Sequence, residues 1–149
     1  MPARFEGLGL QFQYPDNWTL DDSDALLGRK SVTVYSPGGA FWSVAVHFGP
    51  VDAAKLSQAV VDTMRQEYAA LESEEVSEII AGHELSGYDL NFYYLDLTNT
   101  AQIRCLHLGH ASYTIFCQAD DREFQQIERV LQAISTSLVN ELDKSALLG

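Results

Sequence analysis

The stretch that decides the fold is Phe5-Glu6-Gly7-Leu8-Gly9-Leu10-Gln11-Phe12-Gln13-Tyr14, followed by Pro15-Asp16-Asn17-Trp18. Apolar and polar residues alternate through residues 5–14, which is the pattern of a half-buried β-strand. The turn at Pro15 ends this strand and sets Trp18, an aromatic side chain large enough to close one end of a core. The opening therefore predicts a strand, a turn and a structural tryptophan in an α+β domain.

Further strands follow from the same alternation. Residues 31–35 and 41–48 are expected to pair as a hairpin, because Pro37, Gly38 and Gly39 supply turn chemistry between them. The remaining strands are expected at 74–80, 83–97, 102–108 and 113–118, with a turn at 98–100. Glutamates in the first of these favour a sheet edge, and Gly87 indicates a bulge.

Two segments have helical periodicity. Asp52 is placed to cap a helix that starts at about Ala53, and Asp120 with Glu123 resembles a capping box. The apolar stripe of the first helix comprises Leu56, Val60, Val61, Met64, Tyr68 and Leu71, and that of the second comprises Phe124, Ile127, Leu131, Ile134 and Leu138. Beyond residue 139 the period fades, which predicts a frayed tail at 140–149.

These elements predict a single domain over residues 1–149 with a compact core at about 5–139. Short turns join consecutive strands, so the expected fold is α+β, with a largely antiparallel sheet of about six to seven strands flanked by two main helices. The 149 residues are enough to bury a core without disulfides.

The chain is strongly acidic, with 21 Asp and Glu against nine Lys and Arg and a formal net charge of -12. Such a charge repels nucleic acid and anionic membrane surfaces, so neither is expected as a partner. No apolar run is long enough for membrane insertion, and the N-terminus lacks a signal-peptide pattern. The expected location is cytoplasmic.

Cys105 and Cys117 lie on strands expected to be neighbours. In a reducing compartment they are expected to be buried thiols, although a register that set them opposite one another would bring them near bridging distance. The redox state of the pair stays open.

The motifs of familiar catalytic and cofactor sites are absent from the sequence. His47, His83, His107 and His110 show no metal-ligand spacing, and no glycine-rich loop matches a phosphate-binding motif. No catalytic residue, metal site or cofactor is therefore predicted.

A softer set of residues remains as binding candidates. If strand faces coincide, Tyr35, His47, Tyr93 and Arg104 line a polar-aromatic cleft. The alternative interpretation is that these rings pack in the sheet while their polar tips reach solvent. Trp42 joins the candidates through an exposed aromatic surface expected around Trp42 and Tyr93, and an edge strand is the alternative binding surface.

The Tyr14-Pro15-Asp16-Asn17-Trp18 element, the hairpin at 31–42 and the segment Gly87-Tyr88-Asp89-Leu90-Asn91-Phe92 resemble the PsbP-like superfamily, in particular its uncharacterised bacterial members. The superfamily includes an extrinsic photosystem II subunit, a Ran-binding import factor and bacterial chaperones for secreted effectors. The resemblance implies an antiparallel sheet flanked by helices and a mostly non-enzymatic, binding-type role. It carries over no catalytic residue.

The functional expectation is a non-enzymatic protein-binding, assembly or chaperone-like module, with an unknown protein partner or self-association. The alternative is a small-ligand binder or small enzyme that uses the cleft on the sheet. Whether the chain is an enzyme stays open at this point, with a non-enzymatic role favoured.

Overall fold

The computed structural model describes residues 2–26, 30–49 and 51–148. In chain order its elements are β1 (Pro2–Gly7), β2 (Leu10–Pro15), β3 (Thr19–Asp21), α1 (Ser23–Leu26), β4 (Ser31–Tyr35), β5 (Phe41–Phe48), α2 (Ala53–Glu67), β6 (Glu72–Ile80), β7 (His83–Tyr94), β8 (Leu97–Leu108), β9 (Ala111–Asp120) and α3 (Asp121–Leu148).

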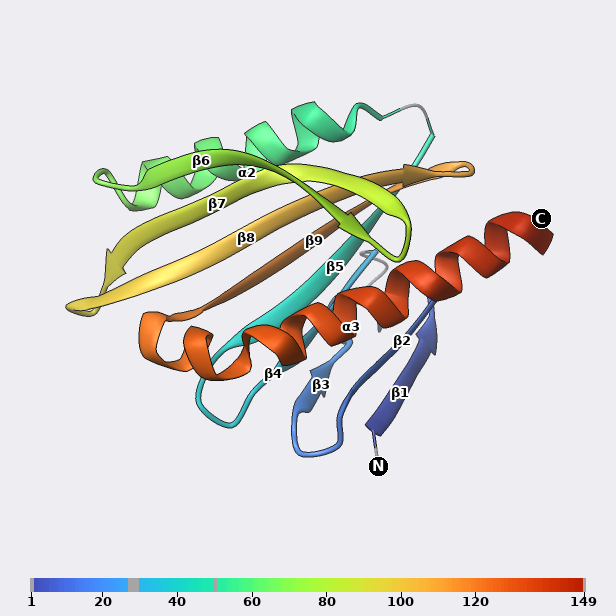
Figure 1. Ribbon diagram of the computed structural model, residues 1–149, viewed down its shortest axis with the longest axis horizontal. Helices are drawn as coiled ribbons and strands as arrows, with labels where there is room; N and C mark the ends of the chain where they lie inside the picture. The colour runs from blue at the N-terminus through green and yellow to red at the C-terminus, as the bar shows by residue number, and fades with distance from the viewer. Residues whose placement is uncertain (1, 27–29, 50, 149) are drawn as a thin grey trace.

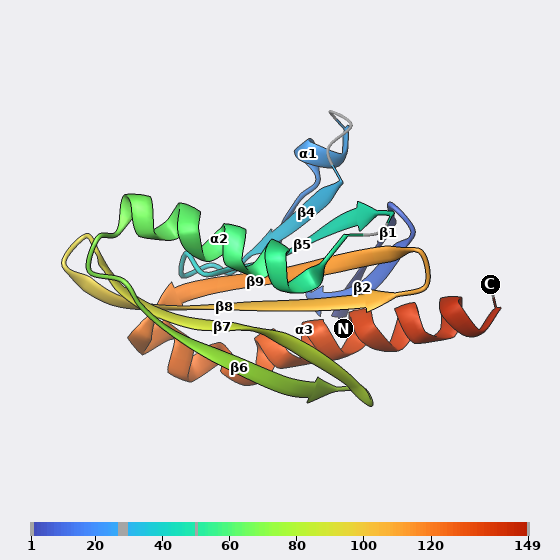
Figure 2. The same ribbon diagram turned by 90° about the horizontal axis from the view of Figure 1, so that it is seen from above.

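Within these residues the strands form a seven-stranded sheet of order β3-β4-β5-β9-β8-β7-β6 and a separate hairpin, β1-β2. Every pairing in both sheets is antiparallel. Helix α2 lies on one face of the large sheet and α3 on the other (Figures 1 and 2). The predicted α+β class, with a largely antiparallel sheet flanked by two main helices, is confirmed, and β6 is the sheet edge that its glutamates indicated.

The expected single strand over residues 5–14 is wrong. The chain reverses at Leu8 and Gly9, both with positive φ, and Gly7 pairs with Leu10. A two-residue turn is so short that it barely interrupts the alternation, which hid the hairpin from the pattern. Trp18 is buried in the core on the α3 side of the sheet, as its structural interpretation requires.

The expected turn at 98–100 is also wrong, because β7 ends at Tyr94 and the chain reverses at Leu95 and Asp96. Both residues have positive φ, of 52° and 62°. Two-residue turns of this kind favour Asn and Gly, and neither stands here, so turn chemistry gave no signal.

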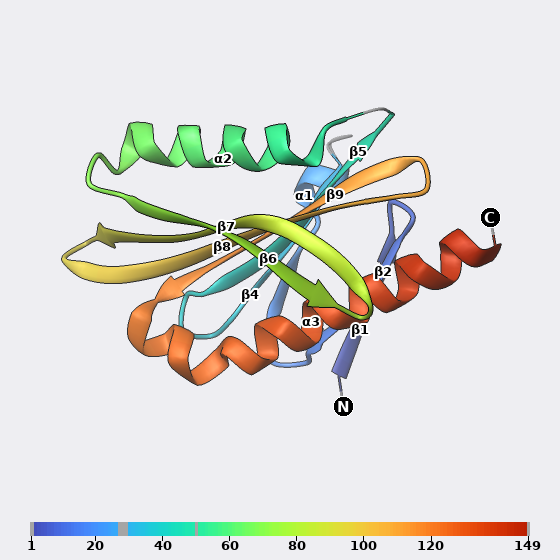
Figure 3. The same cartoon turned by 45° about the horizontal axis from the view of Figure 1, so that its top comes forward.

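The two long helices begin where their caps predict. Asp52 accepts a hydrogen bond from the Ala54 backbone N–H at 2.9 Å, and Asp120 accepts one from Glu123 N–H at 2.9 Å. The frayed tail expected at 140–149 is wrong for its described residues, since α3 continues through Leu148 and buries Leu142. Figure 3 shows this last part of α3 passing the β1-β2 hairpin. Gly149 lies outside the described residues.

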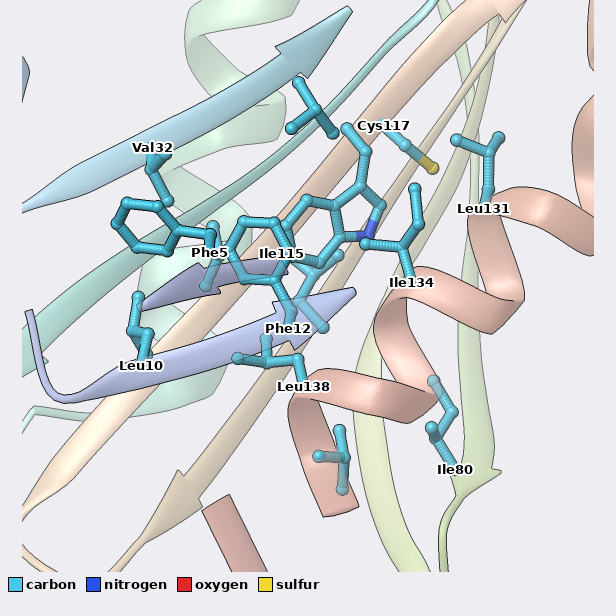
Figure 4. Packing of buried hydrophobic residues seen from close by; sticks show 14 of the residues in the cluster. Phe5, Leu10, Phe12, Val32, Ile80, Ile115, Cys117, Leu131, Ile134 and Leu138 are labelled. Carbon is cyan, nitrogen blue, oxygen red and sulfur yellow. The ribbon is translucent and has the colours of Figure 1, made fainter. Parts of the chain in front are cut away.

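The main core fills the space between the large sheet, α3 and the β1-β2 hairpin. Phe12 of β2 lies near Leu138 of α3 and Ile115 of β9 (Figure 4), and Leu10 and Ile134 belong to the same cluster. A second cluster lies under α2, where Val61 packs against the opposite face of the sheet. The sheet is therefore buried on both faces, and the main contacts of α2 are with β7, β8 and β9.

Gly87 is needed for the close approach of two strands and makes no bulge. Pairing runs without interruption through Gly87 on both sides, to Val76 in β6 and to Arg104 in β8. A Cβ atom added at Gly87 would stand 1.7 Å from the carbonyl oxygen of Ile103. The bulge expected here is wrong, since the glycine serves packing and leaves the register unchanged.

Gly87→Ala should therefore lower the free energy of unfolding by about 3 kcal/mol, because β8 has to move away from β7 to admit the methyl group. Urea denaturation followed by circular dichroism measures this change. Ser86→Ala, at the exposed neighbouring position, is the matched control and should change stability by less than about 0.5 kcal/mol. Equal small effects in both variants would contradict the close approach.

Candidate functional site

The candidate residues on β4 and β5 divide between the two faces of the sheet. Trp42 points toward α3, because it belongs to the cluster under that helix. Alternation along β5 then sets His47 on the opposite face, and Tyr35 lies there through its pairing with Phe41. Tyr35 and His47 share a face but stand six residues apart along the ladder, which is about 20 Å.

Trp42 is fully buried, with no exposed surface. Its indole Nε1–H donates to Ser135 Oγ of α3 at 2.9 Å, and its ring lies 4.8 Å from that of Phe12. The exposed aromatic surface expected around Trp42 and Tyr93 is therefore wrong for Trp42. It is wrong because a side chain with an apolar body and one donor is satisfied completely inside this core.

Arg104 is also buried, and its guanidinium ties three strands together. Its Nη2 lies 2.8 Å from Asp89 Oδ1 and its Nη1 donates to the Ile103 carbonyl, while Nε stands 3.5 Å from Glu78 Oε1. Nε has no hydrogen-bond partner among the described residues. The charge is thus held by carboxylates of β6 and β7, as a buried arginine requires.

The cleft expected from Tyr35, His47, Tyr93 and Arg104 does not form. Arg104 and Tyr93 lie on the α3 side, because Ile103 and Phe92 next to them point under α2. Tyr35 and His47 lie on the other side. The cleft required all four side chains to share one face of the sheet, and this expectation is wrong. Successive residues of a strand point to opposite faces, and the two pairs occupy positions that point in opposite directions.

The two cysteines lie on opposite faces of the sheet. Cys105 pairs with Thr114 and belongs to the cluster under α2, whereas Cys117 pairs with Gln102 and belongs to the cluster under α3. Both are free and buried, so the register that would bring them to bridging distance is not the one adopted. Burial raises the pKa of the Cys117 thiol to about 12, although the nearby Arg104 charge opposes this shift.

The most exposed apolar part of the described molecule is the tip where β7 turns into β8. Four large side chains are exposed there within five positions: Tyr93 at 70%, Tyr94 at 47%, Leu95 at 77% and Leu97 at 56%. We call these four residues the β7-β8 tip. In Figure 1 this turn forms one end of the long sheet. Apolar side chains gathered in this way are characteristic of interaction surfaces.

The tip rests on a rigid aromatic base. Tyr68, at the end of α2, stacks on Phe92 with ring centroids 4.5 Å apart and meets Tyr94 edge-on at 6.2 Å. Burial raises the pKa of the Tyr68 hydroxyl above its ordinary value. Leu97 pairs with Tyr94 and points the same way, while Tyr93 points to the α3 side. The tip thus presents apolar surface in two directions.

Sequence reasoning named Tyr93 but missed Tyr94, Leu95 and Leu97. The available signal was the run Phe92-Tyr93-Tyr94-Leu95, four consecutive large apolar residues followed by an acidic one, toward the end of the strand expected at 83–97. Such a run cannot be buried on one face, which marks either a central strand or an exposed tip. The turn at Leu95 decides for the tip.

Comparison with solved structures identifies the fold. The chain is similar to the cyanobacterial PsbP protein CyanoP of Synechocystis sp. PCC 6803, with a TM-score of 0.61, 12% identity and coverage of 91% of this chain and 90% of that one. It is similar to the yeast Saccharomyces cerevisiae Ran-binding protein Mog1p at a TM-score of 0.55 and 10% identity, covering 97% and 93%. It is also similar to the Pseudomonas aeruginosa protein PA94, described as a putative regulator of unknown function, at 0.58 and 10%, covering 92% and 95%.

The chain therefore has the PsbP-like fold, at an identity that carries the fold alone. No family model matches the sequence, and no curated protein matches it. Among the described residues, no three His, Cys, Asp or Glu side chains are grouped so as to hold a metal ion. No helix in the described ranges is long and apolar enough to cross a membrane.

The buried Cys117 thiol makes stability depend on alkaline pH. Its pKa rises from 9.0 to about 12 on folding, so above about pH 9 the unfolded chain releases a proton that the folded chain keeps. The free energy of unfolding should then fall with rising pH, and wild type should lose about 1 kcal/mol more than Cys117→Ala between pH 8 and pH 10. Urea titrations at both pH values measure the difference. An identical pH slope in the two proteins would contradict the burial of this thiol.

Proposed function

We propose that this chain is a non-enzymatic protein-binding or assembly module that contacts its partner through the β7-β8 tip. The observation that carries the proposal is the exposure of Tyr93, Tyr94, Leu95 and Leu97 in one short stretch. Tyrosine anchors of this kind contribute large contact areas with few rotatable bonds. A partner with an apolar cavity would remove all four side chains from water.

The charge of the chain supports a partner other than a second copy. Two chains that each carry a net charge of -12 repel each other, whereas a basic protein is attracted. Carboxylates lie near the tip: Asp96 is in the turn itself, and Glu72 and Asp121 line a hollow with Tyr93. We therefore propose a partner with an apolar cavity and a basic rim.

The tip is preorganised for binding. The Tyr68 base holds Phe92 and Tyr94 in place, and a two-residue turn closes the hairpin. A preformed surface loses little conformational entropy when it binds, which raises affinity for a given contact area. The similarity in fold to Mog1p, described as Ran-binding, supports a protein-binding role. We further propose a cytoplasmic location, which the two unpaired buried cysteines support.

Leu95→Asn separates binding from folding. Asparagine tolerates positive φ better than leucine, so this substitution should raise the free energy of unfolding by about 1 kcal/mol. It also removes the most exposed apolar side chain of the tip. A partner recovered from native extract on the wild-type protein, then purified and titrated by calorimetry, should bind Leu95→Asn at least about tenfold more weakly.

Ile79→Thr is the matched control, because Ile79 is equally exposed but lies on β6, outside the tip. This variant should bind the partner with wild-type affinity. The proposal is overturned if Leu95→Asn binds as tightly as wild type, or if both variants lose affinity equally. If sedimentation shows dimers of the wild-type protein that are absent in Leu95→Asn, the tip mediates self-association, and the proposal of a basic partner is overturned.

A further inference from the structure

A second candidate site lies on the opposite side of the fold from α2, where the β1-β2 hairpin meets α3. A groove of about 500 Å³ opens there, within the size range of small-molecule sites. Its apolar lining is formed by Pro2, Tyr14, Pro15, Val130, Ala133 and Ile134. Figures 1 and 3 show β2 running beside the middle of α3 along this line.

The groove exists because a strand and a helix are held side by side with a small residue between them. Ser137 fixes the separation: its hydroxyl accepts from the Gln13 backbone N–H at 2.9 Å and donates to the Ile134 carbonyl at 2.7 Å. Ala133, one turn earlier on α3, has only a methyl group and leaves the space open. The walls of the groove are formed mainly by strand β2 and helix α3, so the groove is present before a ligand binds.

The same hydrogen bond argues against a peptide as occupant. A peptide that extended the β1-β2 hairpin would pair with the free edge of β2. Ser137 already occupies the Gln13 N–H on that edge, so an incoming strand would lose this position of the ladder. A ligand that needs apolar contact and one polar anchor fits the groove better.

Arg129 supplies the anchor. Its side chain lines the groove, is exposed, and forms no ion pair or hydrogen bond with the described residues. Asp16, a carboxylate that also lines the groove, has an interaction of its own. A guanidinium binds a carboxylate with two parallel hydrogen bonds, while the neighbouring apolar walls can bury the chain of an amphiphile.

We propose that this groove binds a carboxylate amphiphile of the medium-chain fatty-acid class, with its head on Arg129 and its chain along Tyr14, Val130 and Ala133. This site is separate from the β7-β8 tip and does not depend on the proposed function.

The test is an amide-resolved NMR titration of the full chain with decanoate below its micelle concentration. Saturable shifts should appear at Tyr14, Val130, Ala133 and Ser137. Arg129→Gln should weaken the affinity about tenfold, and the uncharged analogue 1-decanol should bind wild type about tenfold more weakly than decanoate. Ala133→Phe should abolish binding by filling the groove.

Arg122→Gln is the matched control, because Arg122 is an exposed arginine of α3 that does not line the groove. It should bind decanoate with wild-type affinity. The proposal is overturned if no saturable shift occurs, if Arg129→Gln binds as wild type, or if the shifts gather at the β7-β8 tip. A carboxylate-terminated apolar peptide that binds more tightly than decanoate would also overturn it. If Ala133→Phe fails to fold, the comparison of Arg129→Gln with Arg122→Gln decides.

Discussion

The interaction on which the architecture depends is the contact of Trp42 with Phe12 and Ser135. It joins three parts of the chain that are distant in sequence: β5 of the large sheet, β2 of the N-terminal hairpin and the middle of α3. The ring supplies apolar contact area, and its N–H is satisfied inside the core, so burial leaves no donor unpaired. The hairpin is held against the helix by this contact and by the Ser137 hydroxyl, which fixes the groove between them.

Burial of Trp42 and Arg104 also decides where function can lie. Both residues are types that often mark binding surfaces, yet here one closes a core and the other neutralises two carboxylates across three strands. What remains for recognition is the perimeter: the apolar tip where β7 meets β8, and the groove beside α3. The tip belongs to β7 and β8, and β9 separates these strands from β5, which carries Trp42, so changes at the tip leave the core contact intact.

Much of the fold could be predicted from the sequence because caps and alternation act locally. Asp52, Asp120 and the turn at Pro37 each define an element boundary through its own chemistry. The hairpin turns at Leu8 and Leu95 could not be predicted, because a leucine with positive φ is held by strand pairing rather than by its own preference. The predicted cleft was wrong for a related reason. Alternation along a strand decides which face of the sheet a side chain occupies, and how two strands align depends on the position of the turns.

A double-mutant cycle on Trp42 and Ser135 tests this account most directly. Trp42→Phe should lower the free energy of unfolding by about 3 kcal/mol, since it leaves a cavity and an unpaired hydroxyl. Ser135→Ala should lower it by about 1 kcal/mol, and the two effects should be non-additive by at least about 1 kcal/mol, because the residues share one buried hydrogen bond. Additive effects, together with a Trp42→Phe cost below about 0.5 kcal/mol, would show that Trp42 lies at the surface and contradict the account.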